Sequence, residues 1–182
     1  EVVEPDTLLV DITGCQRLFG GEANIARQAV AGLRELGFCA RAAIADTVGA
    51  AYALAWAGVS GEAARPPGAL ACAARSDRVE VIVVPVGEVE AWLGPLPPAA
   101  LRLDGATVGR LDALGVRTIG DLLKLPRATL LARFGKLLGR RLQQALGEVH
   151  EGVGTLELAD VPMVRASFEP PAGDLLPVLA AA

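Results

Sequence analysis

The stretch LGVRTIGDLLKLPRATLLARFG, residues 114–135, decides the fold of the second half of the chain. It contains two short segments, Thr118–Lys124 and Arg127–Phe134, which are separated by a proline and bounded by Gly115 and Gly135. Leucine, alanine and arginine favour helix, whereas proline and glycine end helices. The pattern therefore predicts a pair of short helices inside a larger helical module.

Short helices are also predicted on both sides of this stretch, again separated by Gly and Pro: Glu88–Leu93, Ala99–Leu103, Thr107–Leu114 and Leu137–Leu146. Residues 148–165 lack a strong hydrophobic period, and we expect a linker there. Phe168–Leu179 is expected to begin a further element.

The first half of the chain alternates strand and helix patterns. Apolar, β-branched runs predict strands at Leu8–Thr13, Cys39–Ala45 and Val79–Val84. Helices are predicted at Glu22–Leu36, which Gly37 would end, and at Gly49–Trp56, with Thr47 as N-cap, and Gly58–Ser76 is expected to be loop or weak helix. Such alternation indicates a small α/β layer, although the sequence leaves the strand order open.

Composition limits the class of protein. The 182 residues suit one or two domains, and 52% hydrophobic with 4% aromatic residues predicts an aliphatic core. No apolar run approaches the ~18 residues of a membrane span, and no signal peptide precedes the first strand, so we expect a cytoplasmic protein without membrane contact. Both ends look cut from a longer chain. Cys15, Cys39 and Cys72 have no metal-like spacing and are expected to be free, buried thiols.

Charge is distributed unevenly along the chain. The net charge is −4, yet residues 101–147 hold nine Lys or Arg and three acids, a net charge of +6, and the remainder carries −10. Such asymmetry concerns partners rather than fold, and it points to a binder of polyanions in this window.

The run VEPDTLLVDITG, residues 3–14, resembles the second catalytic motif of Y-family (DinB/UmuC-type) DNA polymerases. That motif is Ser-x-Asp-Glu followed by an apolar strand with Leu-Asp-x-Thr-Gly. Asp6 stands at the aspartate position, but Thr7 replaces the metal-binding glutamate and Glu4 the serine.

Four other stretches extend the resemblance over nearly the whole chain. Residues 17–21 (RLFGG) and 43–55 (AIADTVGAAYALA) are similar to ImuB-type sequences, residues 114–135 to the thumb, and residues 168–171 (FEPP) to the entry of the little finger. The resemblance implies an α/β (α+β) fold: a partial ferredoxin-like palm over 1–87, a helical thumb with helix-hairpin-helix-like elements over 88–147, and a linker with the start of a little finger over 148–182.

The departures from the family's motif imply that this chain has lost catalytic activity. Nucleotidyl transfer needs divalent metals held by several carboxylates, and a threonine hydroxyl does not replace a bridging carboxylate. Lysines near the incoming nucleotide are also missing, since Asp46, Val48 and Tyr52 stand at those positions. We expect no catalytic residue, no metal and no cofactor in this chain, with Mg²⁺ required only if the intact protein is an active polymerase. Asp6 is either a vestigial metal ligand or a solvated acid, and Asp11 is expected to be structural.

The helical module is expected to contact the DNA backbone. The first hairpin looks degraded because Asp104 intrudes beside Gly105, whereas residues 133–141 (RFGKLLGRR) keep two glycines and four cations. Candidate DNA-binding residues are Thr107, Arg110, Arg133, Gly135, Lys136, Gly139 and Arg140. The alternative is a solvated basic helix face. Phe134, Trp56 and Trp92 are expected to pack, and His150 to lie on the surface.

The resemblance implies a non-catalytic adaptor in bacterial error-prone translesion synthesis and SOS mutagenesis. Its implied partners are primer–template DNA, the sliding clamp, a RecA-like accessory protein and an error-prone C-family polymerase, mostly through regions outside this chain. The alternatives are an active Y-family lesion-bypass polymerase and a protein-interaction scaffold without DNA affinity.

Overall fold

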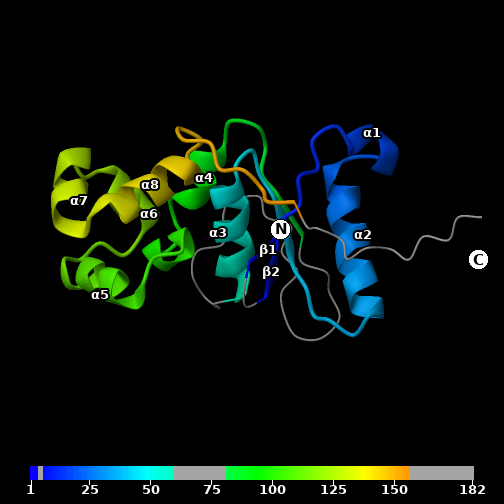
Figure 1. Cartoon of the computed structure of the whole chain (residues 1–182), viewed down its shortest axis with the longest axis horizontal. Coiled ribbons are helices and arrows are strands. Elements are labelled where there is room, and N and C mark those ends of the chain that lie inside the picture. The colour runs from blue at the N-terminus through cyan, green and yellow to red at the C-terminus, as the bar shows by residue number, and fades with distance from the viewer. Residues whose placement is uncertain (4–5, 60–80, 156–182) are drawn as a thin grey trace, which may run out of the picture.

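The computed structural model describes residues 1–3, 6–59 and 81–155, and Cys72, the end of the predicted linker, Phe168–Leu179 and the FEPP motif lie outside this part. Figure 1 shows an elongated arrangement in which a helix, a small sheet, a central helix and a helical module follow one another. The fold class is mixed α/β, as predicted. No helix in the described ranges combines the length and apolar character that a membrane span requires.

In the described residues, four short strands form two separate sheets. β1 (Val2–Val3) pairs antiparallel with β2 (Thr7–Leu8), and β3 (Ala42–Ile44) pairs parallel with β4 (Val81–Val83). The second and third predicted strands are therefore confirmed over their central residues.

The predicted strand Leu8–Thr13 is confirmed only at its start, where Leu8 lies in β2 and Leu9 exchanges two backbone hydrogen bonds with Glu1, and it is wrong for residues 10–13, which are in no strand. The Asp11 carboxylate accepts a hydrogen bond of 2.9 Å from the Thr13 backbone N–H. This local turn takes a backbone donor away from strand pairing.

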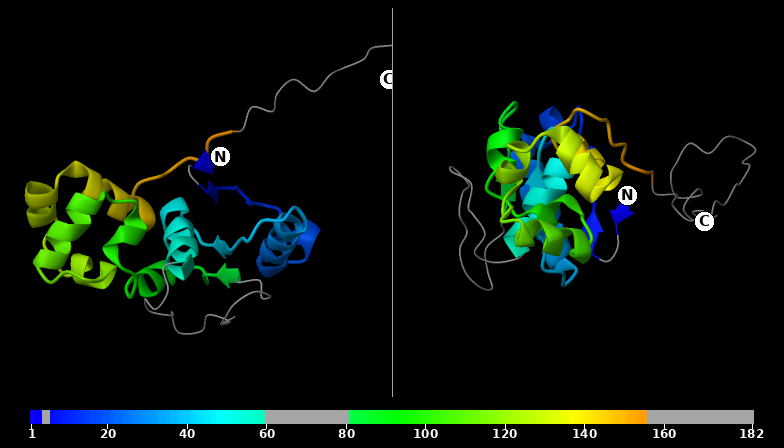
Figure 2. Two further views of the ribbon diagram at one scale, coloured as in Figure 1. Left: turned by 90° about the horizontal axis from the view of Figure 1, so that it is seen from below. Right: turned by 90° about the vertical axis from the view of Figure 1, so that its left-hand side faces the viewer.

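Helices cover both sides of the β3–β4 sheet. α1 (Gln16–Phe19) leads into α2 (Glu22–Glu35), which contacts β3 and β4 and buries Ala26 and Val30, four residues apart on one helix face. α3 (Val48–Val59) contacts β3 on one side and the helical module on the other. Figures 1 and 2 show the sheet between these two helices. The predicted N-cap is confirmed, since Thr47 Oγ1 accepts a bond of 3.1 Å from Ala50 N–H.

The helical module follows the predicted pattern of short helices. Its elements are α4 (Val89–Leu93), the 3₁₀ helix η1 (Pro98–Leu101), α5 (Gly105–Ala113), α6 (Ile119–Leu123), α7 (Arg127–Phe134) and α8 (Lys136–Ala145). α6 begins with a reciprocal cap in which Thr118 and Asp121 each accept a hydrogen bond from the other's backbone N–H. The segment predicted at Ala99–Leu103 is a single 3₁₀ turn.

One aliphatic core joins α3 to the helical module. Its fully buried large side chains are leucines and one isoleucine, spread over α3, α4, the following turn and α5 to α8: Leu54, Leu93, Leu96, Leu111, Ile119, Leu122, Leu130 and Leu138. Trp56, Trp92 and Phe134 pack against or within this core, as predicted. The division into 1–87, 88–147 and 148–182 stays a prediction.

The cysteine expectation is wrong for the two described thiols. Cys39 is exposed and Cys15 is only partly covered, although both are free. Cys39 lies in the connection between α2 and β3, and Cys15 lies immediately before the four-residue α1, so neither thiol reaches the core. His150 is exposed, as predicted.

Candidate functional site

Helices α7 and α8 meet at a single glycine. Gly135 ends one helix and begins the other with φ of 81°, in the left-handed region that only glycine adopts at low cost. A Cβ at Gly139 would lie 2.9 Å from Leu131 Cδ2, so the two helices pack closely one turn beyond the junction. Among the described residues, no side chain caps α8, so the N–H groups of its first turn are available to a ligand.

Three exposed cations surround this junction. Arg133 lies in the last turn of α7, Lys136 is the first residue of α8, and Arg140 follows one turn later. Within the described ranges, none of the three has an acidic side chain within ion-pair distance. Residues four apart on a helix lie on the same face, so Lys136 and Arg140 point to the same side.

Most of the other cations of the helical module form ion pairs with acidic side chains. Arg102, Arg117, Lys124, Arg127 and Arg141 each pair with an acid, at 2.7 Å for Arg102 and 3.8 Å for Arg117. Arg127 and Glu148 form a two-point contact, which raises the pKa of Arg127 and lowers that of Glu148. Of the four module cations without an ion pair among the described residues, three lie at the α7–α8 junction, and the fourth, Arg110, lies over the Phe134 ring.

In the first predicted hairpin, an aspartate of the same segment occupies the N-terminus of the helix. Asp104 caps α5, and its two carboxylate oxygens accept hydrogen bonds from the Thr107 N–H at 2.8 Å and the Thr107 hydroxyl at 2.9 Å. These bonds, followed by the charge of Arg110, hold the Asp104 pKa below its ordinary value. A carboxylate therefore occupies the helix terminus at which a phosphate would bind.

Thr107 and Arg110 have structural contacts in this hairpin. Thr107 is 5% exposed, and its hydroxyl also accepts a hydrogen bond of 3.0 Å from Arg110 Nη2. The Arg110 guanidinium lies 5.7 Å from the centre of the Phe134 ring and so connects α5 with α7. The structure brings Arg133, Gly135, Lys136, Gly139 and Arg140 together at one junction. It places Thr107 in the interior, in the first turn of α5.

The candidate catalytic positions lie on the β1–β2 hairpin. Asp6 is exposed in the turn, and the neighbouring Thr7 hydroxyl donates to the Asp6 carboxylate at 3.4 Å. Asp11 has a lowered pKa, first because the Thr13 backbone N–H donates to it. Within the described residues, no three His, Cys, Asp or Glu side chains are grouped to hold a metal ion.

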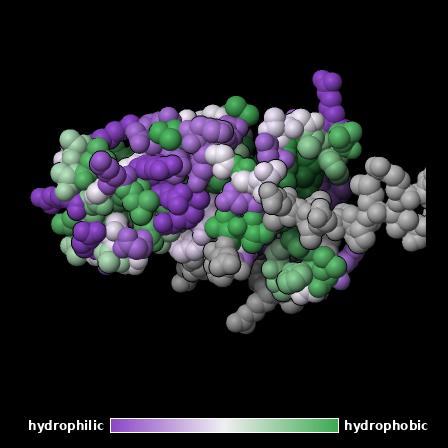
Figure 3. Space-filling model, viewed as in Figure 1, coloured by the Kyte–Doolittle hydropathy of each residue, from purple (hydrophilic) through white to green (hydrophobic). Residues whose placement is uncertain are grey.

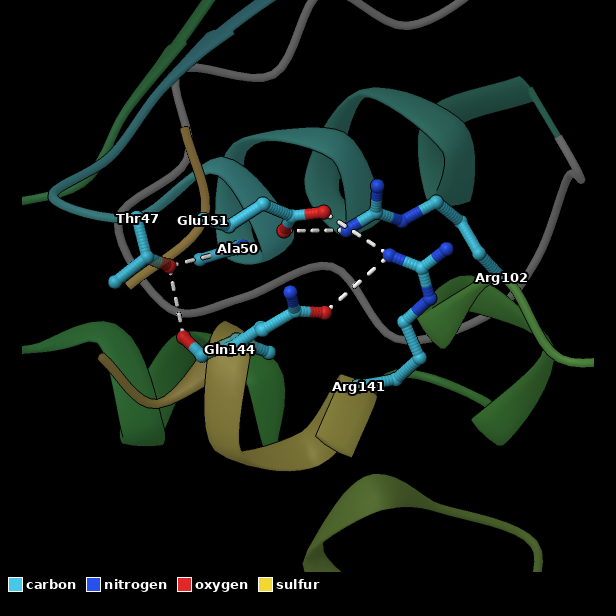
Figure 4. A network of polar contacts seen from close by, with 7 residues as sticks. Thr47, Ala50, Arg102, Arg141, Gln144 and Glu151 are labelled. Atoms are coloured by element: carbon cyan, nitrogen blue, oxygen red, sulfur yellow. Dashed lines mark hydrogen bonds and ion pairs between the residues drawn. The ribbon is translucent and has the colours of Figure 1, made fainter. Parts of the chain in front are cut away.

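Sequence reasoning missed a polar network between α3, η1, α8 and residues 150–152. Figure 4 shows Arg102 and Arg141 converging on the carboxylate of Glu151, at 2.7 and 3.0 Å. Glu151 is only 14% exposed, and Arg102 also lies 5.1 Å from the centre of the Tyr52 ring.

The same network reaches α3 directly. The Thr47 hydroxyl that caps α3 donates a 2.8 Å hydrogen bond to the carbonyl oxygen of Ala145 at the end of α8. A lone Glu in a segment without periodicity gives no sequence signal of such a role, because its partners are 10 and 49 residues away.

Comparison with known proteins gives homologues but no matching structure. The chain is 41% identical over 148 residues to "Protein ImuB" of Caulobacter vibrioides, an alignment that covers 81% of this chain and 28% of that protein. It is 35% identical over 143 residues to "DNA polymerase IV" of Desulfatibacillum aliphaticivorans, covering 74% and 31%, and 29% identical over 147 residues to "DNA polymerase IV" of Moorella thermoacetica, covering 79% and 32%. The chain thus spans about a third or less of the length of these relatives. No family model and no solved structure matches it.

Proposed function

This chain is an ImuB-type member of the Y-family of polymerase-like proteins, and we propose that it serves error-prone translesion synthesis as a non-catalytic adaptor that holds primer–template DNA by its backbone. The observation that carries the proposal is the cluster of unpaired cations at the α7–α8 junction. Membership alone fixes neither the adaptor role nor the DNA contact, so both depend on the chemistry of this chain.

The junction has the components of a phosphate site. The uncapped N-terminus of α8 offers backbone N–H groups and the positive end of the helix dipole. Arg133, Lys136 and Arg140 add three charges with no acidic partner in the described part of the chain. Backbone donors and flexible cations recognise phosphates regardless of base sequence, which suits a protein that must follow any template.

The residues at the former catalytic positions support a role without catalysis. Thr7 offers a hydroxyl where the resemblance implies a metal-bridging carboxylate. Two positions where it implies lysines near the nucleotide hold side chains with other contacts: Asp46 accepts from Gly87 N–H at 3.3 Å, and Tyr52 lies beneath Arg102. Neither side chain supplies positive charge to a triphosphate.

The partners belong to the proposal as well. The implied sliding clamp, RecA-like accessory protein and error-prone C-family polymerase would be engaged mostly by regions outside this chain, while the helical module supplies the contact to DNA. A pure protein scaffold is the competing function, which the net charge of −4 and the acid-capped first hairpin favour. An active lesion-bypass polymerase is the other alternative.

Charge reversal tests the DNA contact. We expect the double variant Arg133→Glu and Lys136→Glu to lose most of its affinity for a fluorescent primer–template duplex in anisotropy titrations at low salt. Arg27→Glu combined with Arg34→Glu is the control with the same change in net charge, since both arginines are exposed on α2 at the opposite end of the molecule. Equal affinities of the two variants would overturn the proposed contact and favour the scaffold.

Primer extension tests the adaptor role. The intact protein that contains this chain should not extend a primer with Mg²⁺ and deoxynucleotides, whereas an active Y-family polymerase should do so under the same conditions. The variant Thr7→Glu, which restores the glutamate of the motif, is tested in the same assay. If this variant extends the primer, the lack of a carboxylate at position 7 accounts for the lost activity. Extension by the unmodified protein at the rate of the active relative would establish a polymerase instead.

A further inference from the structure

A cavity of about 350 Å³ lies between α8 and the segment that follows it. One helix face, with residues three and four apart, supplies Leu137, Arg140, Arg141 and Gln144, and the opposite side is formed by His150 and Glu151. Its volume is within the range of small-ligand pockets in proteins. None of His150, Gln144 and Arg141 belongs to the proposed contact at the α7–α8 junction.

The cavity is positively charged. Glu151 is its one acidic lining residue, and both of its oxygens are engaged, one by Arg102 and the other by Arg141. Arg140 remains without an acidic partner among the described residues and is exposed at the rim. Three arginines against one carboxylate leave a net charge of +2 around the cavity.

A buried amide provides a further donor. Gln144 is 4% exposed, and its side-chain oxygen accepts a 3.3 Å hydrogen bond from Arg141 Nη1. This contact fixes the orientation of the amide, as Figure 4 shows, and leaves its NH₂ group without a hydrogen bond to the described part of the chain. Among the described residues, the buried side-chain nitrogen that lacks a hydrogen bond is Nε of the neighbouring Arg141. Such an atom ordinarily has a partner, because leaving it without one costs free energy.

We propose that this cavity binds a phosphate group, with Arg140 and the Gln144 amide as donors and His150 closing the site. Arginine guanidinium and amide N–H groups match the oxygens of a phosphate in number and direction. Leu137, half-exposed at the cavity wall, offers an apolar surface for the sugar that carries the phosphate.

The ligand we assign is the phosphodiester backbone of DNA, which rests on the proposed function. Lys136 and Arg140 lie on one face of α8. A DNA strand that contacts the α7–α8 junction and follows this face of the helix would therefore reach the cavity. A free nucleotide carries the same phosphate chemistry, and the experiment must separate these two sources.

The single histidine of the chain makes a direct test possible. The NMR signal of the His150 imidazole is followed at fixed neutral pH while a primer–template duplex, a deoxynucleoside triphosphate or inorganic phosphate is added, with chloride at matched ionic strength as control. We expect a saturable shift with the duplex. Arg140→Ala should raise the Kd reported by this signal about ten- to a hundredfold, the effect of one lost charge-assisted hydrogen bond.

Two variants complete the test. Gln144→Glu keeps the acceptor for Arg141 but replaces the donor with a negative charge, and it should abolish the shift. Arg117→Ala, on an exposed cation of the same module, should leave the shift unchanged. A triphosphate or inorganic phosphate that shifts the signal as strongly as the duplex would identify the free phosphate as the source.

Failure of this inference is separable from failure of the proposed function. Duplex binding by anisotropy without any shift of His150, or an undiminished shift in Gln144→Glu, would overturn the cavity site and leave the DNA contact intact. A shift with inorganic phosphate in a chain that does not bind the duplex would keep the cavity site and overturn the proposed function.

Discussion

At the scale of the residue, Glu151 has the largest structural role that the sequence conceals. Its carboxylate is 14% exposed and accepts hydrogen bonds from Arg102, the residue after η1, and from Arg141 of α8. Two arginines held this close repel one another without the acid between them. A partly buried ion triad of this kind is costly to break because the remaining charges lose their partner while still shielded from water.

We therefore predict that Glu151→Gln lowers the free energy of unfolding by about 2–3 kcal/mol, since it removes the charge that compensates two shielded arginines. Urea denaturation followed by circular dichroism measures the change. Glu148→Gln is the control, because its ion pair with Arg127 is far more exposed and contributes little. Equal destabilisation by the two variants would contradict the assigned role of Glu151.

At the scale of the element, the helices depend on caps that titrate. Hydrogen bonds from Thr107 lower the pKa of Asp104 below its ordinary value of 3.8, so the folded protein binds a proton there less readily than the unfolded chain. Stability from this cap is thus present above about pH 4 and lost as the pH falls through the lowered folded pKa.

Replacing Asp104 with Asn should make α5 less sensitive to acid. Asparagine caps helices well but does not titrate. We expect the variant to lose less stability than the unmodified chain between about pH 7 and about pH 3 in urea denaturation. Asp11, Asp121 and Glu148 also have lowered pKa values and titrate in both proteins, so the difference between the two curves isolates Asp104. Identical pH profiles would contradict this assignment.

The crossing of α3 and α8 depends on a glycine. A Cβ at Gly49 would lie 2.8 Å from Ala145 Cα and 2.9 Å from its N, both backbone atoms that cannot move aside. Gly49→Ala should therefore destabilise the protein by about 1–3 kcal/mol through overpacking. Gly109→Ala in α5, where no atom lies within 4 Å of the new Cβ, should stabilise it by about 0.5–1 kcal/mol. Stability that is unchanged in Gly49→Ala would show that the helices can separate.

Most elements could be predicted from the sequence, because glycines, prolines and caps mark their ends. Thr47 and Thr118 are N-caps, and each is followed by a helix that begins at the next residue. The strand at Leu8–Thr13 could not be predicted correctly, since its apolar pattern competes with the turn that Asp11 makes with Thr13. Burial of Cys15 and Cys39 also failed as a prediction, because thiol burial depends on which segments reach the core.

At the scale of the whole molecule, the sequence shows that cations are concentrated in residues 101–147, but it does not show which of them are paired with acids. Nine cations lie in residues 101–147, yet the fold pairs five of them with acids, and three of the other four lie around Gly135 without an acidic partner among the described residues. Figure 3 shows hydrophilic side chains over much of the helical module, with larger hydrophobic areas over the sheet and α2. Partners such as Glu151 lie outside the window, so only the structure could identify the free cations.

The salt dependence of DNA binding tests the central claim most directly. The logarithm of the association constant for a duplex should fall linearly with the logarithm of salt concentration, by about 0.9 for each phosphate contacted. Replacing Arg133, Lys136 and Arg140 with alanine should make this slope shallower by about 2–3 units and weaken binding. An unchanged slope in the triple variant, or no binding by the unmodified chain even at low salt, would contradict a DNA grip at the α7–α8 junction.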